Sequence, residues 1–305
     1  MQCGFIGLGM LGARMARQVM DAGHALKVFD LDDAAVEQLV AHGATRAVSV
    51  AQAASEVDVL ITCLPSPEAS TKVMTSNNGA LDAMHEGSCW IEMSTTDANE
   101  MIRLAELAAD RGIGVLECPA TGGVHRAARG EMTLLVGGDE ALFNRHASLL
   151  ETLSGQIVYM GKVGNASLIK VITNLLCLVD LVAMGEALML AKRGGLDLAR
   201  CYEAITASSG SSREFEDWAP VILNGSLNTG FTTDLGLKDL GLVTELGRNL
   251  EVPLQLTTLV EQMFKASRER YGGSAWTPHV VKMMEDATGE SLRAPGFAEV
   301  IPTEW

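Results

Sequence analysis

Basic residues are scarce in this sequence. Among its 305 residues, 23 are Lys or Arg and 38 are Asp or Glu, so the formal net charge is −15. A surface this negative repels phosphate backbones and anionic lipids, which argues against nucleic acids and membrane surfaces as partners. Hydrophobic residues make up 48% of the chain and charged residues 20%, a balance that fits a globular protein and excludes a disordered one.

Metal-binding and redox spacings are also absent. No two of the six cysteines lie within four residues of each other, and none of the six histidines has a partner at ligand spacing, so we expect no metal site. A chain this long needs no disulfides, and a reducing cytosol is its natural setting. The apolar N-terminus lacks the basic segment and cleavage site of a secretory signal, so we expect a cytoplasmic protein.

One apolar stretch, 171–191, is long enough to resemble a membrane span. It contains Asn174, Asp180 and Glu186, however. Two acids and an amide are costly in lipid, so the stretch is predicted to be a buried helix of a soluble protein.

The first half of the chain alternates short apolar runs with helical patterns. The predicted strands are 2–6, 25–29, 58–63, 89–92, 114–118, 133–137 and 157–160, and the main helices between them are 10–22, 33–42, 97–111 and 139–152. This alternation predicts an α/β domain with a mostly parallel, doubly wound sheet and helices on both faces.

Strand signals stop near residue 164. A helical pattern over 165–193 predicts a helix of roughly 43 Å at about 1.5 Å per residue. Further helices are predicted at 197–207, 214–223, 232–249, 253–271 and 278–286. We therefore divide the chain into an α/β domain, 1–163, and an all-helical domain, 164–305, joined by the long helix.

A glycine-rich turn follows the first predicted strand and precedes a helix. It reads Gly7-Leu8-Gly9-Met10-Leu11-Gly12. In such a GxGxxG turn the first glycine permits the tight turn, the second admits a pyrophosphate and the third allows close helix packing. The N-terminus of the helix then offers N–H groups to the phosphates. The pattern predicts a dinucleotide site; the alternative is a structural turn.

Acidic residues end the second predicted strand. Asp30 lies where a carboxylate can accept hydrogen bonds from a ribose 2′-hydroxyl. Asp32 and Asp33 follow, and no arginine lies beside them. A 2′-phosphate would meet like charge there, which favours NAD over NADP. The alternative for these acids is helix capping.

Two more segments follow strands at the carboxyl edge of the sheet, where α/β domains bind ligands. They read Leu64-Pro65-Ser66-Pro67 and Ser94-Thr95-Thr96-Asp97. Their hydroxyls could contact the cofactor or cap helices. Capping is the better interpretation for Thr96 and Asp97, whereas both remain open for Ser94 and Thr95.

Thr121-Gly122-Gly123 follows another strand, and its consecutive N–H groups could cradle an anion. The alternative is a mobile loop. At the start of the long helix, Lys170 and Asn174 are one turn apart and share a face. Lys170 heads an apolar stripe, where partial desolvation would favour its neutral form and suit it to acid–base chemistry. A lysine that reaches solvent from the helix end fits the pattern equally well.

These segments together resemble the β-hydroxyacid dehydrogenase family, typified by 3-hydroxyisobutyrate dehydrogenase and tartronate semialdehyde reductase. The resemblance covers nearly the whole chain and follows the family's order, through GFIGLGMLGARMA, CLPSPEAS, EMSTTD, PATGGVHRAARGEMTLLVGGD, GKVGNASLIKVITN and FTTDLGLKDLGL. It implies a Rossmann domain followed by an all-helical domain, which usually mediates formation of dimers or tetramers.

The resemblance also implies residue roles. Lys170 would be the catalytic acid–base, Asn174 would orient it or the substrate, and Lys238 would lie beside the cofactor. Thr121, Gly122 and Gly123 would hold the substrate carboxylate. The complete set predicted to bind the cofactor is Gly7, Gly9, Met10, Leu11, Gly12, Asp30, Leu64, Pro65, Thr95 and Lys238.

The chain departs from the family at several positions. Thr121 stands where serine is usual and keeps the hydroxyl, while Ala166 and Thr173 replace a glycine and an asparagine that flank the lysine. Arg213 lies where many members carry an aromatic residue.

His125, Arg126 and Arg213 are potentially cationic groups near the expected substrate. They suggest a substrate with a second anionic or strongly polar group, with Arg126 and Arg213 as binding residues. The alternative is surface pairing of the three with Glu117, Glu131 or Glu214.

The sequence thus predicts NAD-linked oxidation of a small 3-hydroxy acid, or reduction of the matching semialdehyde. The Tyr-x-x-x-Lys pattern of short-chain dehydrogenases is absent, because Val163, Thr206 and Ala275 occupy the lysine positions. Imine reductases resemble the family but usually lack the lysine. A non-catalytic NAD-binding or sensing protein is the third alternative, and the intact Lys170 argues against it. The particular hydroxy acid, the direction and the subunit number do not follow from the sequence.

Overall fold

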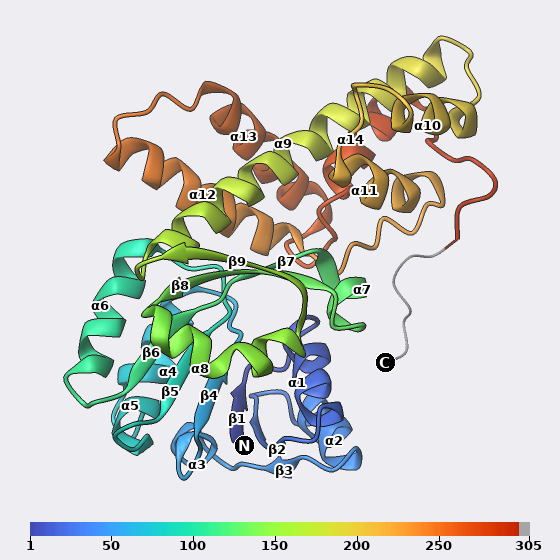
Figure 1. Ribbon diagram of the computed structural model, residues 1–305. Helices are drawn as coiled ribbons and strands as arrows, with labels where there is room; N and C mark the ends of the chain where they lie inside the picture. Colours follow the sequence, from blue (N-terminus) through green and yellow to red (C-terminus); the bar gives the residue numbers. More distant parts are fainter. Residues whose placement is uncertain (299–305) are drawn as a thin grey trace. The chain divides into compact units, whose positions relative to one another are not determined.

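The computed structural model describes residues 1–298 (Figure 1). The chain forms two compact units, Met1–Lys170 and a second that starts at Val171. The last residues of the predicted helical domain, 299–305, lie outside the described part.

The first unit is built on one nine-stranded sheet. Its strands are β1 (Gln2–Ile6), β2 (Ala25–Phe29), β3 (Thr45–Arg46), β4 (Val59–Thr62), β5 (Cys89–Glu92), β6 (Gly114–Glu117), β7 (Ala120–Thr121), β8 (Met132–Gly138) and β9 (Ser154–Gly161). The order β3-β2-β1-β4-β5-β6 is entirely parallel and is that of a dinucleotide-binding domain. Two strands run in the opposite direction: β8 pairs antiparallel with β6 and β7, and β9 pairs in parallel with β8. The predicted mostly parallel, doubly wound sheet is confirmed.

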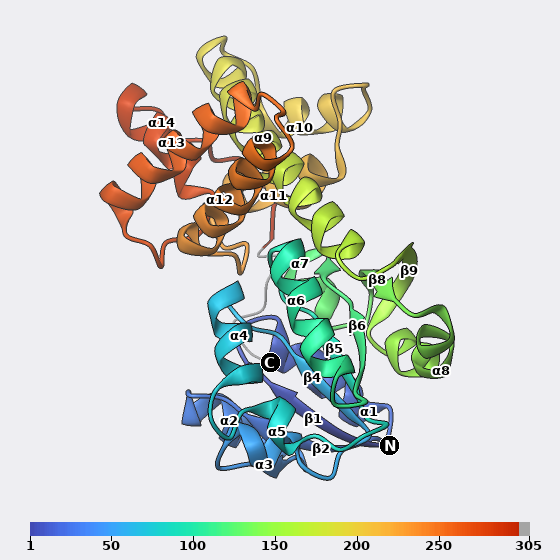
Figure 2. The same cartoon turned by 90° about the vertical axis from the view of Figure 1, so that its left-hand side faces the viewer.

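Helices cover both faces of this sheet. They are α1 (Gly12–Asp21), α2 (Asp33–Ala41), α3 (Val50–Ala54), α4 (Pro67–Thr75), α5 (Ala80–Ala83), α6 (Ala98–Ala109), α7 (Gly123–Ala127) and α8 (Glu140–Glu151). Figure 1 shows α5 and α6 on one side of the sheet and α1 and α2 on the other, and Figure 2 has α5 and α6 towards the viewer. Neighbouring residues of β1 serve different faces, because side chains alternate along a strand. Phe5 belongs to the same buried cluster as Met15 of α1, whereas Ile6 belongs to the cluster that includes Met101 of α6.

The second unit is all-helical, as predicted. Its helices are α10 (Leu198–Thr206), α11 (Arg213–Leu223), α12 (Thr233–Asn249), α13 (Gln255–Tyr271) and α14 (His279–Thr288), and α9 (Asn165–Arg193) runs from the first unit into it. Within the described residues, α9 is the one helix long and apolar enough to cross a membrane. Leu178, Leu181 and Leu188 of α9 are fully buried in the helical core, whereas Leu176 and Leu190 of the same helix are exposed.

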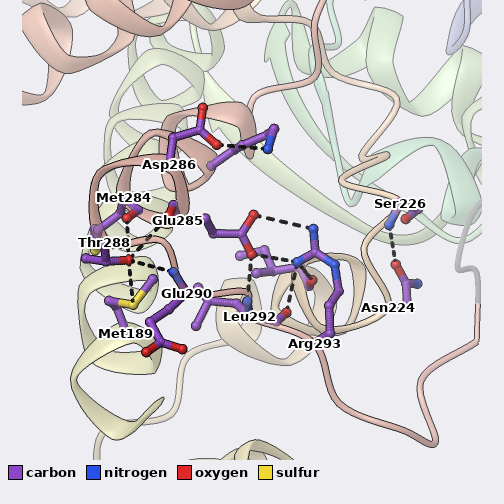
Figure 3. A network of polar contacts seen from close by, with 12 residues as sticks. Met189, Asn224, Ser226, Met284, Glu285, Asp286, Thr288, Glu290, Leu292 and Arg293 are labelled. Atoms are coloured by element: carbon purple, nitrogen blue, oxygen red, sulfur yellow. Dashed lines mark hydrogen bonds and ion pairs between the residues drawn. The ribbon is translucent and has the colours of Figure 1, made fainter. Parts of the chain in front are cut away.

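An ion pair between a buried glutamate and a more exposed arginine fixes the segment after α14 (Figure 3). The Arg293 Nη1 atom lies 2.7 Å from Glu285 Oε1, and the Leu292 N–H donates to the same oxygen at 2.7 Å. Arg293 also donates to the carbonyl of Ile222 in α11 at 3.1 Å. Because Glu285 is buried, its carboxylate depends on these donors for its solvation.

The Arg293→Met variant should therefore lose about 2 kcal/mol of stability, since the buried Glu285 carboxylate then keeps the Leu292 N–H but loses its cation. Urea denaturation followed by circular dichroism would measure this loss. As a control, Arg17→Met removes the exposed pair between Arg17 and Asp21 and should cost less than about 1 kcal/mol. Equal losses in the two variants would contradict the argument.

Candidate active site

The glycine turn joins β1 to α1 with the geometry that a pyrophosphate needs. A Cβ atom on Gly7 would lie 2.2 Å from the carbonyl oxygen of Cys63, and one on Gly12 would lie 2.0 Å from that of Gly7. Gly7 also has a φ of 98°, which favours glycine. A Cβ on Gly9 would meet no atom within 4 Å. The first and third glycines thus close the turn, while the second leaves its outer side open to a ligand.

Donors are available at this turn. No side chain among the described residues caps the start of α1 at Leu11, so its first N–H groups can bind an anion. Met10 is exposed beside them, and the side chain of Leu64 lies 3.1 Å from the Cβ position of Gly7. The structure therefore brings the predicted segments after β1 and β4 together.

The Asp30 carboxylate is held in place by backbone donors. It accepts the Leu8 N–H at 2.5 Å and the Asp32 N–H at 2.8 Å, which ties the end of β2 to the glycine turn. A carboxylate has about four acceptor positions, so it can still accept a ribose hydroxyl. Asp32 caps α2 through the Ala34 N–H at 2.9 Å, so the capping interpretation holds for Asp32.

An arginine does lie beside these acids, contrary to the sequence analysis. Arg46 of β3 has one guanidinium nitrogen 2.8 Å from Asp33 Oδ1 and the other 2.6 Å from Glu37 Oε1. The sequence separates them, but β3 pairs in parallel with β2 and returns Arg46 to the end of that strand. Hydrogen bonds to the two acids raise the pKa of Arg46. The negative charges of Asp33 and Glu37 offset the positive charge of the guanidinium.

A buried acid that the sequence analysis missed supports the loop after β4. Glu92 ends β5 and accepts hydrogen bonds from both the N–H and the hydroxyl of Ser94. The oxygen of that hydroxyl in turn accepts the Leu64 N–H at 2.7 Å. Burial raises the pKa of Glu92, while the donors from Ser94 oppose this shift. Ser94 is thus a buried bridge between the two loops rather than a helix cap.

Of the residues after Ser94, one caps a helix and another does not. Asp97 caps α6 by accepting the Glu100 N–H at 2.9 Å, as the sequence analysis expects. The expectation is wrong for Thr96, whose buried hydroxyl makes no hydrogen bond with the described residues. Thr95 is half-buried and Pro65 is exposed.

The Thr121 loop has the backbone of an anion cradle. Gly122 and Gly123 have φ angles of 128° and 77°, and α7 starts at Gly123. The side chains of α7 fold back over these glycines. A Cβ atom on Gly122 would lie 2.8 Å from Arg126 Cδ, and one on Gly123 would lie 3.3 Å from the His125 ring. Two potentially cationic side chains therefore flank this loop.

The surface-pairing alternative fails for Glu117, which is fully buried at the end of β6. Its carboxylate instead accepts the N–H groups of Ala166 and Ser167, at 2.8 and 3.1 Å, and the Ser167 hydroxyl at 2.5 Å. Glu131 pairs with Arg129 at 2.8 Å. The three hydrogen bonds to Glu117 attach the first turn of α9 to the sheet.

Lys170 and Asn174 lie on α9, with 7% and 9% of their surfaces exposed. In the second unit, Asn174 Nδ2 donates to Asp239 Oδ2 at 2.6 Å, and Lys238 Nζ lies 2.7 Å from Asp239 Oδ1. Asp239, 1% exposed, is a residue that the sequence analysis missed. The available signal was an acid next to Lys238 within an apolar helical pattern. Arg213 is exposed at the start of α11.

Family models match almost the whole described chain. The NAD-binding domain of 6-phosphogluconate dehydrogenase matches residues 2–161. The NAD-binding domain of NADP-dependent 3-hydroxyisobutyrate dehydrogenase matches residues 164–284. The fold and the glycine turn therefore define a nicotinamide-dependent dehydrogenase.

Curated relatives agree with this class. The chain is 33% identical to 2-(hydroxymethyl)glutarate dehydrogenase of Eubacterium barkeri, over 95% of this chain and 96% of the relative. It is 32% identical to L-threonate dehydrogenase of Cupriavidus necator, over 97% and 98% of the two chains. It is also 32% identical to mouse mitochondrial 3-hydroxyisobutyrate dehydrogenase, over 86% and 80%. The chain belongs to the β-hydroxyacid dehydrogenase family.

Solved structures share the fold. A 3-hydroxyisobutyrate dehydrogenase from Salmonella typhimurium has a TM-score of 0.85 at 30% identity, covering 92% of this chain and 99% of that one. An imine reductase from Streptomyces aurantiacus has a TM-score of 0.64 at 21% identity, covering 93% and 99%, and shows likeness of fold alone.

The glycine turn yields a test of cofactor binding. Gly9→Ala should leave the folded state intact, because its Cβ meets no protein atom, but should weaken NADH binding by tenfold or more (about 1.4 kcal/mol). NADH fluorescence titration and thermal unfolding would measure the two effects. Gly155→Ala is the matched control, since its Cβ would make only ordinary contacts with Glu131. Unchanged NADH binding in Gly9→Ala would contradict the assignment of this turn.

Proposed function

We propose that this enzyme oxidises a small 3-hydroxy acid with NAD, or reduces the matching semialdehyde, with Lys170 as the acid–base. The observation that carries the proposal is a buried lysine on the first turns of α9, in a chain of the β-hydroxyacid dehydrogenase family. The functional boundary of the cofactor-binding domain is proposed at residue 163, ahead of α9. The proposed setting is a cytoplasmic homodimer or homotetramer.

In the proposed mechanism, the N–H groups of Gly122 and Gly123 and the Thr121 hydroxyl bind the substrate carboxylate. This places the substrate hydroxyl at Lys170. In oxidation Nζ of Lys170 takes the hydroxyl proton, and in reduction it returns that proton. The nicotinamide cofactor supplies the hydride acceptor or donor. Correct positioning by the loop contributes as much as the proton transfer.

Asn174 is proposed to orient this lysine or the substrate. Its amide donates to Asp239, and a carboxylate can only accept, so the nitrogen of the amide faces Asp239. The amide oxygen is an acceptor of the kind that an ammonium or a hydroxyl can bind. Asp239 also holds Lys238, which we propose contacts the cofactor.

Replacing the lysine tests this mechanism directly. Lys170→Ala should lower kcat by about 10³-fold, because the proton would have no acceptor, while NADH binding stays within twofold. Steady-state kinetics and NADH titration would measure both. Lys162→Ala is the matched control, since Lys162 is exposed just ahead of α9. Near-normal turnover of Lys170→Ala would rule out the proposed mechanism.

The cofactor proposed is NAD, bound by the glycine turn, Asp30, the Leu64-Pro65 segment, Thr95 and Lys238. A 2′-phosphate near Asp30 would meet two further acids, Asp32 and Asp33. Arg46, which β3 brings to this place, is already shared by Asp33 and Glu37.

Removing the two acids that bind Arg46 should shift the cofactor preference from NAD towards NADP. The double variant Asp33→Ala and Glu37→Ala should raise kcat/KM for NADP relative to NAD by about tenfold, because the guanidinium can then bind the 2′-phosphate. Kinetics with both cofactors would measure the ratio. Adding Arg46→Ala to the double variant should abolish the gain; an unchanged ratio throughout would refute the role of Arg46.

The substrate proposed carries a second anionic or strongly polar group. Support comes from Arg126 and His125, which fold over the glycines of the Thr121 loop, and from Arg213 at the start of α11. The relative named for 2-(hydroxymethyl)glutarate acts on such a dicarboxylate, and the one named for L-threonate on a polyhydroxy acid.

A screen of NAD reduction tests this substrate class. It should include 3-hydroxyisobutyrate, serine, glycerate, threonate, 4-hydroxybutyrate and 2-(hydroxymethyl)glutarate. Arg126→Ala and Arg213→Ala should each raise KM about tenfold for a substrate with the second group and leave 3-hydroxyisobutyrate unaffected. If neither variant changes KM for any substrate, the proposal that the substrate carries a second anionic or strongly polar group is wrong.

A further inference from the structure

Glu117 has an unusual position for a fully buried acid. It ends β6, and the chain continues from it through a short segment to Thr121. Its carboxylate accepts the N–H groups of Ala166 and Ser167 and the Ser167 hydroxyl, all from the first turn of α9. Both carboxylate oxygens are engaged.

This contact supplies what the start of α9 lacks. The first turn of α9 contains no acidic residue of its own. The N-terminus of a helix carries exposed N–H groups and a partial positive charge, which a carboxylate stabilises by charge-assisted hydrogen bonds. Glu117 provides this carboxylate from the sheet, and the helix N-terminus provides the donors that a buried charge needs.

The neighbouring strand leaves room for this arrangement. Gly137 of β8 pairs in register with Glu117, and a Cβ atom at position 137 would lie 2.3 Å from Glu117 Oε1. Any side chain there would displace the carboxylate from α9.

Lys170 lies one helical turn after the anchored residues. Ala166 and Ser167 precede it by four and three positions, and therefore share its side of the helix. On the other side of the contact, Glu117 leads directly into the Thr121 loop. One side chain therefore sets the position of the helix that carries the lysine relative to the strand that leads to the carboxylate cradle.

We propose that Glu117 is a positioning residue, which acts through α9 to hold Lys170 in register with the Thr121 loop. This inference rests on the proposed acid–base role of Lys170. An error of about 1 Å in such an alignment costs about 10²-fold in rate. Glu117 itself touches neither substrate nor cofactor in this role.

Two variants of different severity test the proposal. Glu117→Gln turns one acceptor into a donor that faces the N–H groups of α9, and should lower kcat about 30- to 100-fold. Ser167→Ala removes one of the three hydrogen bonds and should lower kcat about threefold. In both, KM and the NADH dissociation constant should stay within twofold, since neither the cradle nor the cofactor loops are changed. The second variant keeps the test valid if the first does not fold.

Arg293→Met serves as the control for destabilisation alone. It breaks a buried carboxylate contact elsewhere in the chain and should leave kcat unchanged below its unfolding temperature. If Ser167→Ala and Glu117→Gln keep the wild-type kcat, or if kcat and NADH affinity fall together, the positioning role is wrong.

A double-mutant cycle separates this inference from the proposed function. In a Lys170→Ala background, Glu117→Gln should cause no further loss of kcat, because the group that it positions is gone. The same fold-loss in both backgrounds would show that Glu117 acts independently of the lysine and would overturn the inference. Normal turnover of Lys170→Ala alone would instead overturn the proposed function.

Discussion

Hydrogen bonds from backbone N–H groups to acids at the ends of parallel strands hold this α/β unit's loops in place. Asp30 after β2 binds Leu8 of the glycine turn. Glu92 of β5 binds Ser94, which bridges to the loop after β4. Glu117 of β6 binds the first turn of α9. Since all these strands run in one direction, their acids lie along one edge of the sheet, where such domains bind ligands.

Backbone N–H groups also explain how a strongly acidic protein can attract anionic ligands. A chain of net charge −15 that belongs to a family of anion-handling dehydrogenases needs local attraction for phosphates and carboxylates. In the proposed function, backbone N–H groups provide it at the start of α1 and at the Thr121 loop, where His125 and Arg126 also lie. Of the strand-end acids, Asp30 ties the glycine turn to β2, and Glu117 ties the start of α9 to β6.

Sequence reasoning succeeded where the pattern was local. The GxGxxG turn, the strand–helix alternation and the all-helical second unit each depend on residues close together in the chain. It failed where the partners are distant. Glu117 meets α9 and Arg46 meets Asp33 only after strands have paired, and the polar side chains themselves give no sign of burial. Lys238 was predicted by family resemblance, and its partner Asp239 was missed because an acid in a helix is commonly a solvated one.

The close approach of Gly137 to Glu117 has an evolutionary consequence. Either residue alone can be lost only with a clash or an unanchored helix, so substitution at one position is tolerated only together with a change at the other. The two positions are therefore expected to vary together. A larger residue at position 137 would push the Glu117 carboxylate aside and leave the N–H groups at the start of α9 to find another acceptor.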